Sequence, residues 1–382
     1  MNKDRLHQIF ANYIENFERI NNSEHDENYK WRIAHLFHDL INPASPDFAE
    51  KIKEAWNLSA NLIDSSNRYC FSALVTCAEK EPEAVKALFK NLFADDNGDL
   101  SVRQDKILKF IDDANALTSR LHSDNGVFMN DQRSAMAYLF LFDPDNHYLY
   151  KASEARSFAS CIEFYDDWGS GAGFKLDIYY RMCDALVEEI KNSKKLIETN
   201  KSRFYGKNNS KVNDMYPDNN YHILAFDIIY GAPEFRYNFY KGIPFSNITA
   251  QARKLHEERV LKAQELFNKL RKAQEDADLL AEAKKYFSDN IVVGLIVHHK
   301  MFGEGKIVEI NDNNILVLFS RNNETKKFTL MSSFVGKFLS ADISDLSEKV
   351  EKYQIIAQRE QSIVSSLDRA IKELEPYKEY LD

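Results

Sequence analysis

The densest group of basic side chains in this sequence lies between residues 191 and 211. This stretch holds seven lysine or arginine residues against one acidic residue, Glu198. Basic side chains neutralise phosphate groups, and aromatic rings stack on unpaired bases. A lysine-rich helix C-terminus followed by a solvated loop is the alternative interpretation. We predict a nucleic-acid-binding site made of Lys194, Lys195, Lys201, Arg203, Phe204, Tyr205, Lys207 and Lys211.

A second, smaller basic group follows in the last third of the chain. Several acidic residues, among them Glu304 and Glu324, offset part of its charge. Basic and aromatic side chains on a small domain suit either a protein partner or a nucleic acid. We predict a partner-binding surface made of Phe302, Lys306, Arg321, Lys326 and Lys327.

Metal-binding and catalytic motifs are each incomplete. His35 and His38 share a predicted helix, but the sequence indicates no third or fourth ligand. The acidic turn 95–99 fails the spacing of an EF-hand loop, so it is interpreted as a turn. The carboxylates at 143–145 before Lys151 resemble a nuclease motif that lacks its second carboxylate. We therefore expect no catalytic residue set, no bound metal and no cofactor.

The glycine-rich stretch 166–175 is the remaining place where an enzyme site is conceivable. Asp166 and Asp167 precede it, but no histidine or lysine stands at a defined spacing from them. A phosphate-binding loop needs two glycines five residues apart followed by Lys and Ser or Thr, and the sequence contains none. A metal-dependent nuclease with an unrecognised site here is kept as an alternative function.

Composition predicts a helix-rich chain of two to three domains. Of 382 residues only 12 are Gly and 8 are Pro, whereas 44% are apolar. A formal net charge of -9 excludes a globally basic nucleic-acid binder but not a local basic patch. The first residues show no apolar signal core, and no apolar run is long enough for a bilayer. A soluble, cytoplasmic protein with buried free cysteines is expected.

Residues 1–235 are predicted to form a mostly helical recognition domain. Apolar residues at three- and four-residue steps, such as Leu6, Phe10 and Tyr13, are typical of amphipathic helices. Two aromatic-rich segments, Ala135–Phe142 and His147–Lys151, flank a turn and predict a small β-hairpin. The segment 221–232 fits a strand or a helix equally well.

Two long helices, 250–290 and 343–380, are predicted to enclose a small β-domain at 291–340. Their core positions keep a heptad rhythm, so they would pair as an antiparallel hairpin with the β-domain at its tip. Folding back of both helices on the first domain is the alternative. The same heptads could join two chains, so an oligomer is conceivable. The seam residues are Ala263, Leu266, Leu270, Ala273, Ala277 and Leu280, with Leu346, Val350, Tyr353, Ala357, Val364, Leu367, Ile371 and Leu374.

The segment from Val293 to Ile307, with Lys327-Phe328-Thr329 after it, resembles a known module. It resembles the small SH3-like or Tudor-like barrel at the C-terminus of UvrD/PcrA-type helicases. The shared pattern consists of the glycines, the histidine His298 and the pair Phe302-Gly303. The match covers about 45 residues. The resemblance implies a closed β-barrel that binds a protein or a nucleic acid.

The first part of the chain resembles the region in front of the AAA+ motor in McrB-like restriction proteins. The resemblance rests on Trp56-Asn57-Leu58, Arg103 with Phe110, Tyr138-Leu139-Phe140, Tyr148 to Lys151 and Tyr221 to Tyr230. It implies a recognition region without its motor, so NTP hydrolysis is not implied.

The combined interpretation is a non-enzymatic recognition or adaptor protein, in keeping with a prokaryotic anti-phage or restriction-type system. Expected partners are DNA or RNA and a separate ATPase or nuclease subunit, with no membrane. A protein-only interaction scaffold is the second hypothesis, and the metal-dependent nuclease is the third.

Overall fold

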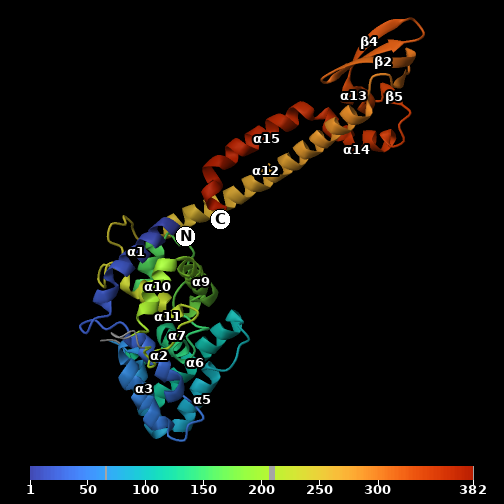
Figure 1. Ribbon diagram of the computed structural model, residues 1–382. Helices are drawn as coiled ribbons and strands as arrows, with labels where there is room; N and C mark the ends of the chain where they lie inside the picture. Colours follow the sequence, from blue (N-terminus) through green and yellow to red (C-terminus); the bar gives the residue numbers. More distant parts are fainter. Residues whose placement is uncertain (65–66, 206–210, 382) are drawn as a thin grey trace. The chain divides into compact units, whose positions relative to one another are not determined.

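The protein divides into two compact units, each with its own hydrophobic core (Figure 1). The structure is a computed structural model that describes residues 1–64, 67–205 and 211–381. The first unit spans Met1–Ala250 and the second Gln251–Asp382. Over the described residues the protein is mainly helical, with one five-stranded antiparallel sheet in the second unit. The predicted mainly helical class is therefore confirmed.

Helices of the first unit bury the apolar faces that their periodicity predicts. In α1, Phe10, Tyr13 and Ile20 recur on one face and are all buried. Pro82 stands in the first turn of α5, and Asp99 caps α6 by accepting bonds from backbone N–H groups. The helices are α1 (Lys3–Ile20), α2 (Tyr29–Leu40), α3 (Phe48–Ile63), α4 (Cys70–Lys80), α5 (Pro82–Leu92), α6 (Leu100–Leu121), α7 (Gln132–Phe142), α8 (Ala152–Cys161), α9 (Leu176–Asn192), α10 (Lys194–Ser202) and α11 (His222–Gly231).

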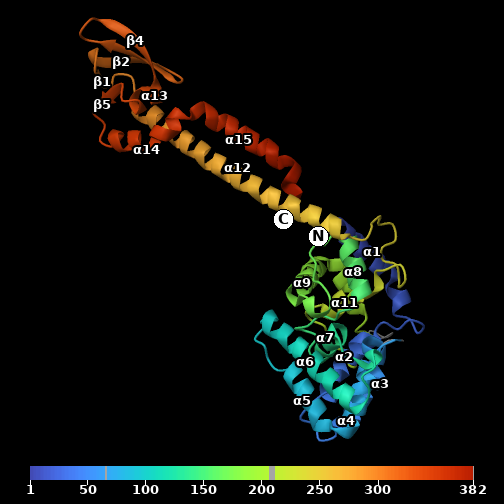
Figure 2. The same ribbon diagram turned by 180° about the vertical axis from the view of Figure 1, so that it is seen from behind.

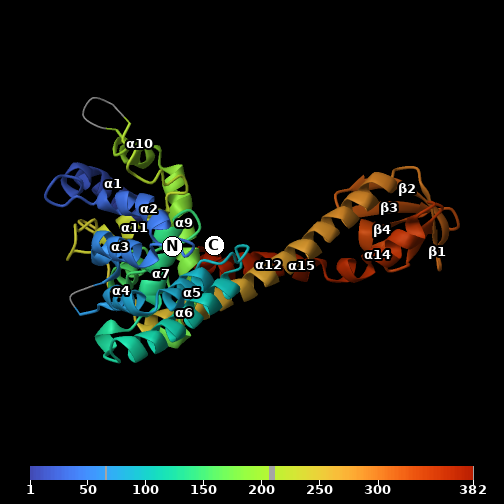
Figure 3. The same cartoon turned by 90° about the horizontal axis from the view of Figure 1, so that it is seen from below.

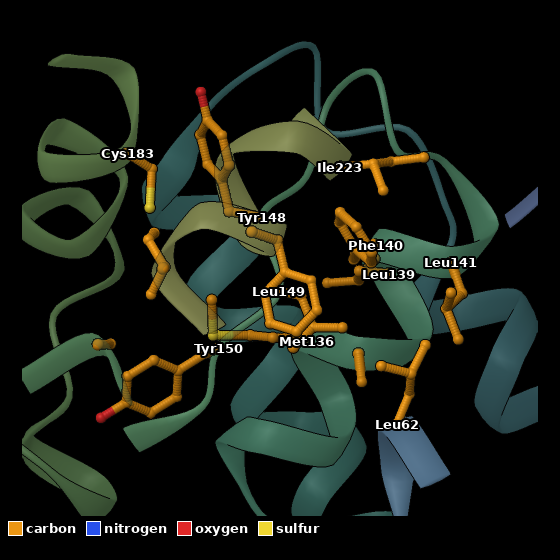
Figure 4. Close-up of a cluster of buried hydrophobic side chains, with 14 of the residues drawn as sticks. Leu62, Met136, Leu139, Phe140, Leu141, Tyr148, Leu149, Tyr150, Cys183 and Ile223 are labelled. Carbon is orange, nitrogen blue, oxygen red and sulfur yellow. The ribbon is translucent and has the colours of Figure 1, made fainter. Parts of the chain in front are cut away.

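The predicted β-hairpin in the first unit is wrong. Ala135–Phe142 is the main part of α7, which Asp131 begins with a capping box. His147–Lys151 forms neither a helix nor a strand, and it pairs with no strand among the described residues. Every residue from Ser134 to Leu141 is buried, so α7 lacks the polar face that would show a helical period. Figure 4 shows Met136, Leu139, Tyr148 and Leu149 in this buried cluster.

The second unit contains an open sheet, so the predicted closed barrel is also wrong. Its strand order is β4-β3-β2-β1-β5, which leaves β4 and β5 at opposite edges. Figure 3 shows the strands β1 to β4 of this sheet. The edge strand β5 has only three residues, and the helix α13 begins directly after β4. Phe334 of α13 and Phe287 of α12 pack in the hydrophobic core that the sheet covers. The elements are β1 (Ile296–His299), β2 (Gly303–Asn311), β3 (Asn314–Phe319), β4 (Glu324–Thr329), α13 (Leu330–Val335) and β5 (Leu339–Ala341).

Two glycines of the sheet are required for two different reasons. Gly303 has a φ of +79°, so it provides the left-handed turn between β1 and β2. Gly305 does not have a left-handed φ. A Cβ atom at this position would lie 2.6 Å from Val317 Cγ1 and 2.8 Å from Phe319 Cδ1. Gly305 is therefore required by the close approach of β2 to β3 rather than by its backbone angles.

The remaining helices of the second unit form an antiparallel hairpin, with the sheet at the end where α12 stops (Figure 2). The helices are α12 (Ala250–Asn290), α14 (Leu346–Gln358) and α15 (Glu360–Leu374). One arm of the hairpin is α12, and the other consists of α14 and α15. Contacts between the two arms set their register. Arg259 Nη1 donates to Tyr380 Oη at 2.6 Å, and Lys284 Nζ lies 2.5 Å from Glu360 Oε1.

Of the fourteen predicted seam residues of the hairpin, seven are buried, five are half-buried and two are exposed. Ala263, Leu266 and Leu280 are buried in α12, as are Val350 and Tyr353 in α14. Val364 and Ile371 of α15 are exposed, and their neighbours Ile363 and Ala370 are buried in their place. The second arm is interrupted at Arg359, so it is two helices rather than one. Among the described residues, no helix is both long enough and apolar enough to span a membrane.

Candidate nucleic-acid interface

The described residues of the predicted nucleic-acid-binding site lie on α10 and in the chain shortly after it. Lys194, Lys195 and Lys201 are exposed on α10, and Tyr205 is 50% exposed just after it. Phe204 is half-buried, and Lys211 is exposed. Lys207 lies outside the described residues, so the structure does not place it.

Four of the predicted residues line one cavity of about 500 Å³ in the first unit: Lys201, Phe204, Tyr205 and Lys211. Backbone pairing brings the last two together, because Tyr205 and Lys211 form an antiparallel bridge. The backbone N–H of Val212 also donates to the carbonyl of Phe204 at 2.9 Å. The other lining residues are His35, Asn200, Val212, Asn213, Met215, Pro217, Asp218, Asn219 and Tyr221.

We call this cavity of about 500 Å³ the basic pocket. Its lining residues suit an anionic, aromatic ligand. The lysines Lys201 and Lys211 supply two exposed ammonium groups. Phe204 and Tyr205 supply aromatic faces, and the exposed amides of Asn213 and Asn219 offer both donors and acceptors. Such a set can neutralise phosphates and stack on a base at the same time. The pocket is therefore the part of the predicted site that folding brings together.

Arg203 does not belong to this surface, so its predicted role in contacting nucleic acid is wrong. Its side chain is fully buried, and its guanidinium carbon lies 3.6 Å from the ring centre of Trp31. Nε donates to Asn200 Oδ1 at 2.8 Å, and Nη2 donates to Tyr13 Oη at 2.7 Å. Since Asn200 lines the pocket, Arg203 positions the wall from behind rather than binding a ligand.

A buried ionic network continues behind Arg203. Lys30 Nζ pairs with Asp227 Oδ1 and lies 2.7 Å from Glu27 Oε2. Tyr13 Oη donates to Asp227 Oδ2 at 2.7 Å. Burial disfavours the Lys30 ammonium, but the carboxylates of Asp227 and Glu27 outweigh it and raise its pKa. The network joins α1, α2 and α11, and so fixes the helices around which the pocket is built.

Asp218 contributes a buried carboxyl group to the lining of the basic pocket. It is 2% exposed, and its two oxygens accept the backbone N–H groups of Ile223 and Leu224 at 3.0 Å each. Burial raises the pKa of Asp218 to about 7, although those two hydrogen bonds act to lower it. The sequence reasoning missed this residue. The signal was an Asp shortly before the apolar start of α11, a position that satisfies free N–H groups.

The other predicted lysines of α10 lie apart from the pocket. Lys195 lines a separate cavity of about 340 Å³, together with His7 and Phe10 of α1. Lys194 is exposed and does not line either cavity. These two residues therefore form a matched set of exposed lysines on the same helix but outside the pocket.

The five predicted partner-binding residues do not share one surface. Lys306 and Lys327 lie on the outer face of the sheet, where Lys306 stands between Ile296 and Leu318 in the strand register. Strand alternation puts Lys326 on the other face, with its Nζ 5.6 Å from the ring centre of Phe302. Arg321 is exposed in the turn between β3 and β4.

Residues considered for metal chemistry are also separated. His35 lines the pocket, whereas His38 stacks on Phe142 with ring centres 4.4 Å apart. Asp166 pairs with Arg181 at 3.1 Å, and Asp167 pairs with Arg156 at 3.6 Å. Within the described ranges, no three His, Cys, Asp or Glu side chains gather in a way that could hold a metal ion. The four cysteines are buried free thiols, as predicted.

Comparison with known proteins adds no family to this picture. No family model, no curated protein and no solved structure matches the chain. The resemblances to the helicase barrel and to the McrB-like region therefore stay predictions.

Proposed function

We propose that the first unit binds single-stranded nucleic acid at the basic pocket, and that the chain is a recognition or adaptor protein. The observation that carries the proposal is the convergence of Lys201, Lys211, Phe204 and Tyr205 on one cavity of about 500 Å³. An unpaired strand is favoured over a duplex, because aromatic rings can stack only on bases that have left a duplex.

Charge supports a local rather than a global mode of binding. Residues 1–250 carry 29 basic and 37 acidic side chains, so the unit as a whole repels a polyanion. Binding must then depend on the few lysines at the pocket and must fall steeply with salt. A place in a prokaryotic anti-phage or restriction-type system, with a separate ATPase or nuclease subunit, is the setting that the two sequence resemblances suggest.

Fluorescence anisotropy with labelled poly(dT), poly(U) and a DNA duplex tests this proposal. The wild-type chain should bind the single strands more tightly than the duplex at low salt. The double variant Lys201→Ala/Lys211→Ala should weaken binding and lower the salt slope by about 0.7 for each phosphate group that the variant no longer neutralises. The matched control Lys194→Ala/Lys195→Ala removes two lysines of α10 outside the pocket and should keep most of the affinity.

Two outcomes would contradict the proposed site. Absence of binding to every probe at low salt would remove the nucleic-acid function altogether. Weaker binding in the control variant, with wild-type binding in the pocket variant, would move the interface to the other side of α10.

A protein-binding role of the second unit is the second candidate. On the outer face of the sheet, Ile296 is 43% exposed and Val308 41% exposed beside Lys306. An apolar surface with a central basic residue suits a partner with apolar and acidic side chains. Pull-down of one defined protein from the native host, retained after nuclease treatment and absent with Lys306→Glu, would support it. Retention in that variant would count against it.

A further inference from the structure

One flank of the helical hairpin carries apolar side chains that the described residues of the second unit leave open to solvent. Phe267 of α12 is 48% exposed, and Val364 and Ile371 of α15 are 53% and 43% exposed. Each of the three directly follows a buried seam residue, namely Leu266, Ile363 and Ala370. In an antiparallel helix pair, residues that follow the same kind of seam position lie on the same side of the seam. We call these three residues the apolar flank.

The interruption at Arg359 shifts the seam of the second arm by one residue. Val350 of α14 is a buried seam residue, whereas Val364 of α15, two heptads later, follows the buried seam residue Ile363 and is exposed. The shift therefore moves Val364 and Ile371 out of the seam and onto the flank, where they are open to a further helix.

The opposite flank of the hairpin is charged. Lys352 Nζ lies 2.7 Å from Glu282 Oε1, which joins the two arms on that side. The pKa of Lys269 is raised by its hydrogen bond to Glu265, and Glu373 on α15 adds to this effect. The hairpin thus has ion pairs between its arms on one flank, whereas the other presents Phe267, Val364 and Ile371 with charged residues around them, so the apolar flank is the better suited to a further helix.

We propose that the apolar flank binds the same flank of a second copy of the chain, so that two hairpins form a four-helix bundle. A twofold axis parallel to the helices of the hairpin places α12 of one copy against α15 of the other. Rotation about this axis does not change the position of a residue along the helix axes. The Arg259–Tyr380 and Lys284–Glu360 contacts put Phe267 near the level of Ile371. In the dimer, Phe267 of each copy then meets Ile371 of the second copy.

Charge complementarity at the rim favours a second copy over an unrelated helix. The same register puts Arg271 of α12 near the level of Asp368 of α15, and the twofold axis brings each against the other across the dimer. Arg271 is exposed, and its Nε lies 4.0 Å from Glu275 Oε1, at the outer limit of an ion pair. The second unit carries 21 basic and 22 acidic residues, so two copies do not repel each other strongly.

Sedimentation velocity of the full chain over roughly 1–100 µM tests the proposal, since a modest helical interface associates in this range. The wild type should shift from monomer to dimer with concentration. Phe267→Glu and Ile371→Glu should each weaken association by roughly ten-fold or more. Ile355→Glu is the matched control, since Ile355 is 67% exposed on α14 away from the apolar flank, and it should leave association unchanged.

A charge swap keeps the test valid if the apolar variants unfold. Arg271→Asp and Asp368→Arg should each weaken the dimer, and the double variant should restore it. The single variants change exposed residues, so circular dichroism should show unchanged helix content. A monomer at every concentration, a dimer insensitive to Phe267→Glu, or a double variant no better than the single ones would each overturn the proposal.

Discussion

Arg203 holds its guanidinium carbon 3.6 Å from the ring centre of Trp31, inside the first unit. The contact joins the end of α10 to α2, and the same arginine also bonds Tyr13 of α1. The buried Arg203 guanidinium therefore supports the wall of the basic pocket from behind. Arg203 belongs to the predicted basic segment, but its side chain does not reach the surface of the protein.

Arg203→Ala should destabilise the first unit by roughly 3 kcal/mol or more, since it removes a buried cation from the side of Asp227 and leaves polar partners unpaired. Arg203→Lys should not restore stability, because an ammonium group cannot both stack on the indole and keep the forked hydrogen bonds. Urea denaturation followed by Trp fluorescence measures the effect. Lys201→Ala, two residues earlier and exposed, is the control and should change stability by less than ~0.5 kcal/mol. Equal stabilities of Arg203→Ala and the control would contradict this role.

Asp218 should make stability fall as pH rises. Its folded pKa is about 7, above the ordinary value of 3.8, so the folded state holds the proton more tightly than the unfolded chain does. Its contribution is thus fully present below about pH 4 and is lost as the pH rises towards 7.

Asp218→Asn should flatten this part of the pH profile. The amide cannot ionise, and its oxygen can still accept a backbone N–H group of α11. Thermal unfolding between pH 4 and 8 compares the two proteins. Parallel profiles for wild type and variant would show that another group controls this range.

Gly305→Ala should loosen the sheet of the second unit. The added methyl group would meet Val317 and Phe319 well inside contact distance, an overpacking that costs about 1–3 kcal/mol. Hydrogen exchange of the β2 and β3 amides should accelerate accordingly. Gly173→Ala is the control, because a Cβ atom there meets nothing within 4 Å and its φ is not left-handed. Unchanged exchange in Gly305→Ala would show that β2 and β3 can separate without cost.

Local patterns predicted the helices well and the sheet architecture less well. The spacing in α1 and α12 exposes one polar face to water, so the apolar stripe can be seen in the sequence. In α7 both faces are buried, and a fully apolar run does not distinguish a helix from a strand. Closure of the sheet depends on whether β4 meets β5, a long-range relation that short strand patterns do not contain.

The candidate site shows the same division between local and distant information. Lys201, Tyr205 and Lys211 could be found because they are close in sequence and differ from their acidic surroundings. Arg203 has the same residue type and neighbourhood, yet Trp31 and Tyr13 from far earlier in the chain bury it. Only the packing of α10 on α1 and α2 separates a lysine exposed at the pocket from an arginine buried behind it.

Tyr205 should supply stacking energy rather than charge at the basic pocket. Its ring is half-exposed, and its backbone pairs with that of Lys211, so the ring stands beside this lysine at the pocket. Tyr205→Ala should cost about 1–3 kcal/mol of binding to poly(dT), the usual contribution of one stacked base, whereas Tyr205→Phe should retain most of it. Unlike the lysine variants, Tyr205→Ala should leave the salt slope unchanged, because it removes no cation from the phosphates. Equally weakened binding in the Ala and Phe variants would assign the effect to the hydroxyl group, and a reduced slope in Tyr205→Ala would show that the ring acts only by positioning Lys211.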